Sequence, residues 1–246
     1  MPALSAYKRE LDYSYAPGFF PTIEALTRAS ERVRRVLLSS QAADSDGLRR
    51  VEALCRERGI RTETADRALS RLSGKDNCYA AAVFEKRQDA LDAGRDHLVL
   101  HRPADAGNLG TMLRTALGFG YLDIALIGPC TDVFHPHVTR ASMGAVFSLR
   151  VHEYPDFGSY RALYPGHCLY PFMLKGSVPL GEAAARPVRP FALVFGNEGS
   201  GLPDEFLDYG TPVRIPHSDR IDSLNLSVAA AIGMYEMGKP APGAAD

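Results

Sequence analysis

The chain has 246 residues, of which 46% are hydrophobic and 23% are charged. This composition is typical of a globular protein with one large or two modest domains, and it excludes extended disorder and fibrous repeats. The formal net charge of −1 excludes an overall basic field, so any contact with nucleic acid must be local.

The sequence favours a soluble, cytoplasmic protein without a metal site. Its four cysteines are widely spaced and form no CxxC pair, so neither a zinc site nor a disulfide framework is indicated. No stretch reaches the roughly 20 apolar residues that a membrane span needs, and the N-terminal residues lack the apolar run of a signal peptide. His135 and His137 resemble a metal pair, but they have no acidic or cysteine companions at ligand spacing, and we expect a surface loop there.

Residues 1–90 carry an excess of basic side chains, with 16 basic and 13 acidic residues against 12 and 16 in the rest of the chain. Eleven arginines lie between Arg28 and Arg71. Arginine suits phosphate contacts. The same residues could instead be the solvated faces of amphipathic helices, balanced by nearby Glu and Asp. The pattern alone leaves both interpretations open.

The hydrophobic pattern predicts an α/β fold throughout the chain. In residues 1–90 it predicts helices at 22–30 and 47–59, the second closed by Gly59, and strands at 33–40, 60–65 and 79–85. The polar segment 86–96 is expected to hold a domain boundary. The tail, residues 241–246, is rich in Pro, Ala and Gly and is expected to be disordered.

From residue 97 onward the pattern predicts a mostly parallel sheet covered by helices on both faces. Ligands of such sheets bind beyond the carboxyl ends of the strands. The strands are expected at 97–102, 124–128, 149–154, 168–173, 191–196 and 212–216, and the helices near 108 and at 138–147, 157–163, 204–210 and 226–237.

Three junctions at the ends of predicted strands could carry chemistry. At the first, a Pro-Ala-Asp-Ala-Gly turn leads into a helix for which Asn108 is a plausible N-cap. Arg114 follows in an apolar run, where it needs a partner if it is buried. Its stem could equally pack while its head reaches water.

The second junction is the glycine-rich sequence GNEGSG at residues 196–201. Its GxxGxG spacing differs from the dinucleotide fingerprint, and it lacks the lysine of a P-loop. Glu198 would also repel a phosphate. The glycines could let the backbone approach a flat or positively charged ligand closely. A tight turn, or a nucleotide site of another kind, remains an alternative.

The third junction precedes the last predicted helix, for which Ser223 or Asn225 could be the N-cap. The helix carries small residues on successive turns, which indicates that something packs closely against it. That neighbour could be a partner subunit or the sheet of the same chain.

Taken in order, NLGTMLRTA, FGNEGSGLP and IPHSDRIDSLNLSVAAA resemble the three motifs of the SpoU/TrmH family in the SPOUT superfamily, over residues 95–238. The resemblance implies a trefoil-knotted sheet in a methyltransferase domain at residues 95–240, and a homodimer formed through it. It also implies methyl transfer from S-adenosylmethionine (AdoMet) to a ribose 2′-oxygen in structured RNA, with rRNA favoured over tRNA. Residues 1–90 resemble an L30e-like RNA-binding domain.

The resemblance also implies roles for particular residues. Two features depart from the family pattern: Asp219 stands where some members have glycine, and YPFMLKG at residues 170–176 replaces smaller and hydroxylated residues. A non-catalytic RNA-binding or assembly protein on the same scaffold is the alternative function. The implied catalytic residues are Asn108, Arg114, Glu198, Ser223 and Asn225, and the implied cofactor-binding residues are Phe172, Gly196, Asn197, Ile215, Ser223 and Leu224.

Overall fold

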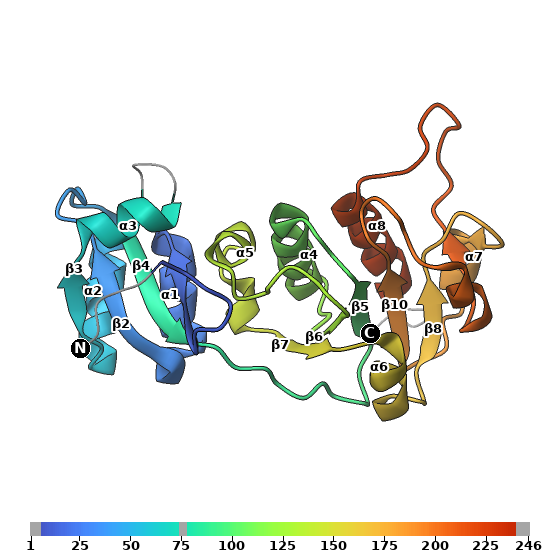
Figure 1. The fold of residues 1–246 in the computed structure, drawn as a ribbon, viewed down its shortest axis with the longest axis horizontal. Helices are drawn as coiled ribbons and strands as arrows, with labels where there is room; N and C mark the ends of the chain where they lie inside the picture. The colour runs from blue at the N-terminus through green and yellow to red at the C-terminus, as the bar shows by residue number, and fades with distance from the viewer. Residues whose placement is uncertain (1–5, 74–77, 240–246) are drawn as a thin grey trace. The chain divides into compact units, whose positions relative to one another are not determined.

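The computed structural model describes residues 6–73 and 78–239, and the chain divides into two units (Figure 1). The N-terminal unit consists of Met1–Arg87, Leu109–Arg114 and Asp132–Ser148, and the C-terminal unit consists of the remaining residues. The domain boundaries expected from the sequence stay predictions. The predicted disorder of residues 241–246 concerns residues outside those that are described.

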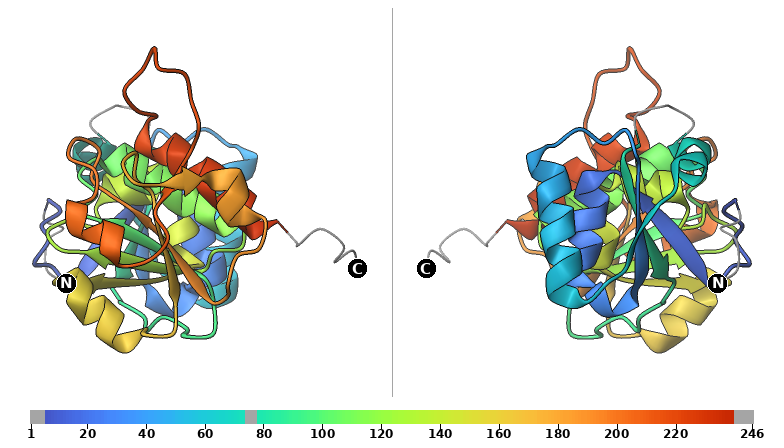
Figure 2. Two further views of the ribbon diagram at one scale, coloured as in Figure 1. Left: turned by 90° about the vertical axis from the view of Figure 1, so that its right-hand side faces the viewer. Right: turned by 90° about the vertical axis from the view of Figure 1, so that its left-hand side faces the viewer.

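The N-terminal unit is built on a four-stranded sheet in the order β1-β4-β2-β3. Strand β4 runs antiparallel to β1 and β2, whereas β3 is parallel to β2. Helices α1 and α2 lie side by side, as the right-hand view of Figure 2 shows. The elements of this unit are β1 (Tyr13–Pro17), α1 (Phe19–Arg28), the 3-10 turn η1 (Ser30–Arg32), β2 (Val33–Leu38), α2 (Asp46–Arg58), β3 (Thr62–Thr64), α3 (Asp66–Ser73), β4 (Ala80–Glu85), α5 (Pro136–Ala141) and the 3-10 turn η2 (Ala145–Phe147).

Local capping explains where α2 begins and ends. The Ser45 side chain accepts a hydrogen bond from the Leu48 amide at 3.3 Å, which satisfies one of the free donors at the start of the helix. Gly59 adopts a left-handed conformation with a φ of 66°, in which glycine avoids the steric penalty of a Cβ atom. The predicted end of this helix at Gly59 is confirmed.

The predicted helix over 138–147 is wrong in its second half. Helix α5 ends at Ala141, and both Met143 and Gly144 have positive φ angles before the turn η2. A Cβ atom on Gly144 would lie 2.7 Å from the Cβ atom of Glu24. Close packing against α1 therefore requires glycine here, and the left-handed backbone breaks the helix.

The C-terminal unit contains a five-stranded, entirely parallel sheet in the order β7-β6-β5-β10-β8. This confirms the predicted parallel sheet. The elements of this unit are β5 (His97–His101), α4 (Ala106–Gly118, part of which belongs to the N-terminal unit), β6 (Asp123–Ile127), β7 (Arg150–Tyr154), α6 (Phe157–Leu163), β8 (Cys168–Pro171), β9 (Val178–Pro179), α7 (Leu180–Ala184), β10 (Phe191–Phe195), the 3-10 helix η3 (Asp204–Asp208), β11 (Val213–Arg214) and α8 (Leu226–Gly238).

The burial of the strands follows their place in the sheet. All residues of β6 and β10 are buried, because both strands lie inside the sheet and are covered on both faces. The chain runs outward from β5 through β6 to β7, then crosses to β8 at the other edge and returns to β10. The connections therefore change direction between β5 and β10, which is where open parallel sheets hold their ligands.

The predicted strand over 212–216 is shorter than expected and lies outside the main sheet. Only Val213 and Arg214 are extended as β11, and they pair with β9 in a separate two-stranded sheet. Within residues 6–73 and 78–239, no helix is both long and apolar enough to cross a bilayer.

A buried ion pair joins the starts of β6 and β7. The Asp123 carboxylate is fully buried, and it accepts hydrogen bonds from Arg150 Nε at 2.6 Å and from Arg150 Nη2 at 2.5 Å. Replacing Arg150 by alanine leaves a buried carboxylate without its counter-charge. We therefore expect Arg150→Ala to lower the free energy of unfolding, measured in urea, by about 3 kcal/mol. The less disruptive Arg150→Lys should lose less, and a loss below about 1 kcal/mol for Arg150→Ala would contradict this account.

His97 should make the stability of the protein depend on pH. Its buried ring lies between the Asp92 carbonyl oxygen, 2.9 Å from Nε2, and the Tyr160 hydroxyl, 3.0 Å from Nδ1. Burial lowers the pKa of His97 from 6.5 to about 4. Between these values the unfolded chain binds a proton that the folded chain does not, so stability falls as the pH drops from 6.5 to 4. Urea unfolding should show a loss of about 3 kcal/mol or more. Burial also lowers the pKa values of His101, His135 and His167, so His97→Leu should reduce this loss without abolishing it. A His97→Leu variant with the same pH dependence as wild type would refute the assignment.

Candidate active site

A cavity of about 450 Å³ lies in the C-terminal unit, beyond the carboxyl ends of β8 and β10. It is formed by the loop after β8, the glycine-rich loop after β10, the segment that follows β11 and the start of α8. All six predicted cofactor-binding residues line this cavity, although they come from separate parts of the chain. They are Phe172, Gly196, Asn197, Ile215, Ser223 and Leu224.

An aromatic pair forms one side of the cavity. The rings of Phe172 and Phe195 are stacked, with centroids 4.1 Å apart and an interplanar angle of 22°. Gly233 of α8 lies against them, and a Cβ atom there would be 2.6 Å from Cζ of Phe172. At Gly233, α8 therefore packs against the sheet of its own chain. This is one of the two neighbours that the small residues of the helix predicted.

The glycine-rich loop is closed by its own hydrogen bonds. Asn197 and Gly201 pair through both backbone amides, at 3.2 and 2.9 Å, and Gly201 has a φ of 66°. The Asn197 side-chain oxygen accepts from the amides of Gly199 and Ser200, at 2.9 and 3.1 Å. These are the amides that a phosphate cradle would offer to its ligand. The loop geometry thus speaks against a nucleotide-phosphate site.

Glu198 joins this loop to the loop between β5 and α4. Its two carboxylate oxygens accept hydrogen bonds from the backbone amides of Ala104 and Asp105, each at 3.0 Å. Asn108 Nδ2 lies 3.5 Å from Glu198 Oε1. A carboxylate with this set of donors fixes the relative position of the two loops, because charged acceptors form the stronger hydrogen bonds.

Asn108 and Asn225 extend the same network to the start of α8. Asn225 Nδ2 donates to Asn108 Oδ1 at 3.2 Å, and Asn225 Oδ1 accepts from the Ser227 amide at 2.9 Å. Asn225 is therefore the N-cap of α8. The sequence predicted either Ser223 or Asn225 at this position. The prediction that Asn108 caps α4 is wrong: Asp105 is the N-cap, and it accepts from the Asn108 amide at 2.7 Å, which leaves the Asn108 side chain free for the network.

The other two predicted catalytic residues lie outside this network. Ser223 lines the cavity and is exposed. Arg114 lies on α4, six residues after Asn108, and is also exposed. Its guanidinium makes no hydrogen bond or ion pair with any residue between 6 and 73 or between 78 and 239. The sequence left open whether Arg114 is buried with a partner or has its charged head in water. The structure shows the second arrangement.

Sequence reasoning missed several charged side chains of the cavity. Lys175 and Asp204 form an ion pair at 3.0 Å beside it, and Arg214, His217 and Asp222 also line it. Lys175 follows β8, Asp204 follows β10 at the start of η3, and Arg214 is the last residue of β11. His217 and Asp222 lie between β11 and α8. These positions are the available signal, because loops at the carboxyl ends of parallel strands face the ligand. Among the described residues, no group of three or more His, Cys, Asp or Glu side chains could hold a metal ion.

Comparisons with known proteins agree with one another. A family model described as the SpoU rRNA methylase family matches residues 96–235. Among curated proteins, the chain is 32% identical over 161 residues to the 23S rRNA (guanosine(2553)-2′-O)-methyltransferase RlmP of Bacillus subtilis, covering 64% of this chain and 63% of that protein. It is 30% identical over 211 residues to the 23S rRNA (uridine(2479)-2′-O)-methyltransferase of Streptomyces viridochromogenes, covering 78% of this chain and 73% of that protein.

A solved structure shows the same fold over most of the chain. The AdoMet-bound rRNA methyltransferase from Sinorhizobium meliloti superposes with a TM-score of 0.77 at 28% identity, covering 92% of this chain and 87% of that one. The chain spans less than two thirds of the length of the Bacillus relative. The family model covers more than half of the chain. It includes the loop after β8, the glycine-rich loop and the segment from β11 to the start of α8, which together line the cavity. The chain therefore belongs to the SpoU rRNA methylase family.

Proposed function

We propose that this protein transfers a methyl group from AdoMet to a ribose 2′-hydroxyl of ribosomal RNA. The observation that carries the proposal is the meeting of three distant sequence segments at one place. Glu198 from the glycine-rich loop, Asn108 from α4 and Asn225 from the start of α8 form one hydrogen-bonded network beside the cavity. Two relatives named as 23S rRNA 2′-O-methyltransferases are 32% and 30% identical to the chain over 161 and 211 residues, and a structural relative is described as bound to AdoMet.

The side chains around the cavity fit AdoMet. The stacked Phe172 and Phe195 offer an apolar surface for a flat base. Acidic side chains, among them Asp222, can balance the sulfonium and ammonium charges, and Arg214 can pair with the carboxylate. We assign cofactor binding to Phe172, Gly196, Asn197, Ile215, Ser223 and Leu224. Bound AdoMet supplies an electrophilic methyl group on a positively charged sulfur.

The remaining assigned residues act on the acceptor RNA and on the geometry of the site. A guanidinium stays protonated in proteins, so Arg114 holds a phosphate beside the target ribose and takes no proton from it. Asn108, Glu198 and Asn225 keep the loops in one arrangement, which aligns the acceptor with the cofactor. Ser223 lines the cavity, and its hydroxyl can donate or accept a hydrogen bond there.

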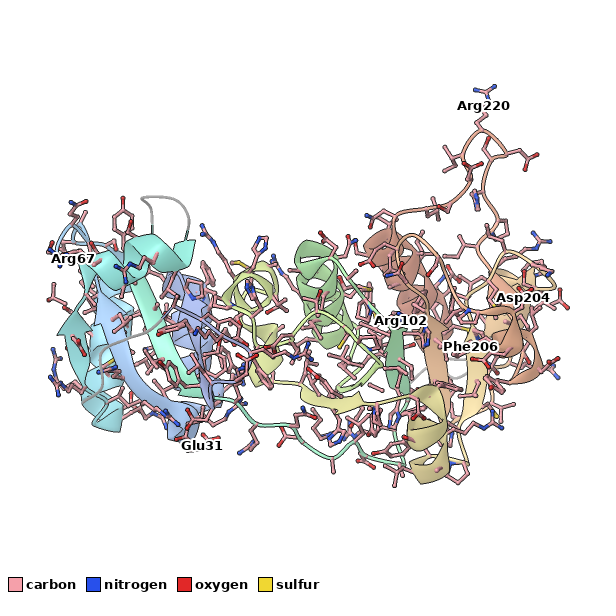
Figure 3. All side chains as sticks on the ribbon, in the orientation of Figure 1. Glu31, Arg67, Arg102, Asp204, Phe206 and Arg220 are labelled. Carbon is pink, nitrogen blue, oxygen red and sulfur yellow. The ribbon has the colours of Figure 1, made fainter. Side chains whose placement is uncertain are left out.

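The N-terminal unit is proposed to bind the RNA substrate as an L30e-like domain. Of the eleven arginines between residues 28 and 71, six are engaged with acidic side chains or a backbone oxygen. The other five are exposed, and their guanidinium groups make no hydrogen bond or ion pair within the described part of the chain. They can therefore contact phosphates without first losing an internal partner. These five are Arg50, Arg56, Arg61, Arg67 and Arg71; Figure 3 labels Arg67.

The proposal includes a homodimer formed through the C-terminal unit. Apolar side chains are exposed on this unit, and Phe119 and Tyr235 lie with ring centroids 5.8 Å apart. Val228 is a further exposed apolar residue of α8. Burying such residues favours association. The trefoil knot expected of the family and the cytoplasmic location belong to the same proposal.

A labelling experiment tests the reaction. Ribosomal RNA from a strain that lacks this gene is incubated with the protein and AdoMet carrying a deuterated methyl group, and the RNA is digested to nucleosides for mass spectrometry. We expect one labelled 2′-O-methylnucleoside. Label on a base would contradict the proposed reaction. Tight RNA binding without any label would favour the alternative, a non-catalytic RNA-binding protein.

A further inference from the structure

Arg102 has a backbone conformation that is unfavourable for its residue type. It directly follows β5, at the carboxyl end of the central strands, and its φ of 56° places it in the left-handed region (labelled in Figure 3). A Cβ atom is sterically disfavoured there, and glycine adopts this conformation without penalty. Strained residues of this kind concentrate at functional sites.

The two bonds that hold this backbone do not require an arginine. The Arg102 amide donates to the carbonyl of Ile127 at 2.9 Å, and the Arg102 carbonyl accepts from Nδ2 of Asn197 at 2.9 Å. Any residue except proline could make both bonds, because Arg102 contributes only its main-chain atoms to them. The link to the glycine-rich loop would therefore survive a change of the side chain.

The Arg102 side chain also lacks an internal role that would explain it. The residue is exposed, and its guanidinium makes no hydrogen bond or ion pair within the described ranges of the chain. Only its stem is positioned: a Cβ atom on Gly128 would lie 3.4 Å from Arg102 Cγ. The stem thus lies beside Gly128, on the β6 side of β5, while the charged head stays available.

The position of Arg102 favours contact with the acceptor strand over contact with the cofactor. The residue does not line the cavity, and it precedes Ala104 and Asp105, whose amides Glu198 binds. Resting on the function proposed above, we propose that the Arg102 guanidinium binds a phosphate of the acceptor RNA. An exposed planar guanidinium suits a phosphate because it can donate two parallel hydrogen bonds.

The test compares variants that separate charge, backbone strain and fold. Arg102→Gly removes the guanidinium and relieves the strain, and Arg102→Gln removes the charge alone. Arg186→Gln is the matched control, since it removes an exposed arginine from the segment between α7 and β10, outside the loop that carries Arg102. For each protein, the Kd for an unmethylated 23S rRNA transcript is measured over a range of KCl concentrations, and the Kd for AdoMet is measured by calorimetry.

We expect both Arg102 variants to bind the transcript about tenfold more weakly than wild type. The slope of log K against log salt should become shallower by about 0.7 to 0.9, as expected for one lost phosphate contact. Arg186→Gln should change RNA binding less than about twofold. In Arg102→Gly the Kd for AdoMet should not rise and the melting temperature should not fall, because the backbone hydrogen bonds remain and the backbone strain is relieved.

Two outcomes would overturn the assignment of Arg102. One is wild-type RNA affinity and salt slope in both Arg102 variants. The other is a loss of AdoMet affinity with unchanged RNA affinity, which would make Arg102 a cofactor residue. A wild-type protein that binds AdoMet but neither binds nor methylates the rRNA would overturn the proposed function as well, so the two failures are distinguishable. Should Arg102→Gly fold poorly, Arg102→Lys keeps the charge and should keep the salt slope.

Discussion

Arg114→Ala should lower the rate of methyl transfer to rRNA by about 10³-fold while the Kd for AdoMet stays unchanged. The guanidinium is exposed and unengaged within the described residues, so its removal deprives the fold of no internal bond. Arg114 also lies outside the lining of the cavity. The measurement pairs single-turnover transfer of a tritiated methyl group with calorimetric titration of AdoMet.

Arg114→Lys and Arg186→Ala serve as controls for this experiment. Lysine keeps the charge but not the two-pronged geometry, so Arg114→Lys should recover part of the lost rate. Arg186→Ala removes an exposed arginine that is not assigned to the site and should behave as wild type. Equal losses of AdoMet binding and methyl transfer in Arg114→Ala would show that the residue belongs to the cofactor site.

Gly196→Ala should damage the cofactor site itself. A Cβ atom on Gly196 would meet the Gly201 carbonyl oxygen at 2.5 Å. A shift of Gly201 would disturb its two backbone hydrogen bonds with Asn197. We expect the loop to shift, the stability in urea to fall by about 2 kcal/mol and methyl transfer to fall about 100-fold. Unlike Arg114→Ala, this variant should also lose affinity for AdoMet.

Gly181→Ala is the matched control for Gly196→Ala. Gly181 lies in the short helix α7, and a Cβ atom there meets nothing within 4 Å. Alanine is the better helix former, so this variant should be as stable as wild type or more stable. Unchanged AdoMet affinity in Gly196→Ala would show that the glycine-rich loop does not form the cofactor site.

Local patterns allowed much of the fold to be predicted. Helix α2 has a serine cap and a terminal glycine, and β10 is a continuous apolar run before a glycine-rich turn. Such signals act over a few residues and are therefore visible in the sequence. The approximate place of the site followed from the same logic, because the carboxyl ends of parallel strands collect the loops that bind ligands.

Long-range partners could not be predicted from the residues alone. Glu198 binds amides that lie more than 90 residues earlier in the chain, and nothing near Glu198 in the sequence indicates them. Asp105 and Asn108 are both suitable helix caps, and only the folded structure shows that Asp105 is the cap. The helix expected over 138–147 fails because Gly144 packs against Glu24, a contact made 120 residues apart.

Hydrogen exchange with and without AdoMet tests whether the three segments around the cavity form one cofactor site. We expect AdoMet to slow amide exchange in the loop after β8, in residues 196–202 and in residues 213–224 together, because all three surround one cavity. The N-terminal sheet should exchange as before. Protection in only one of these segments, or protection confined to other parts of the chain, would contradict a single cofactor site built from all three.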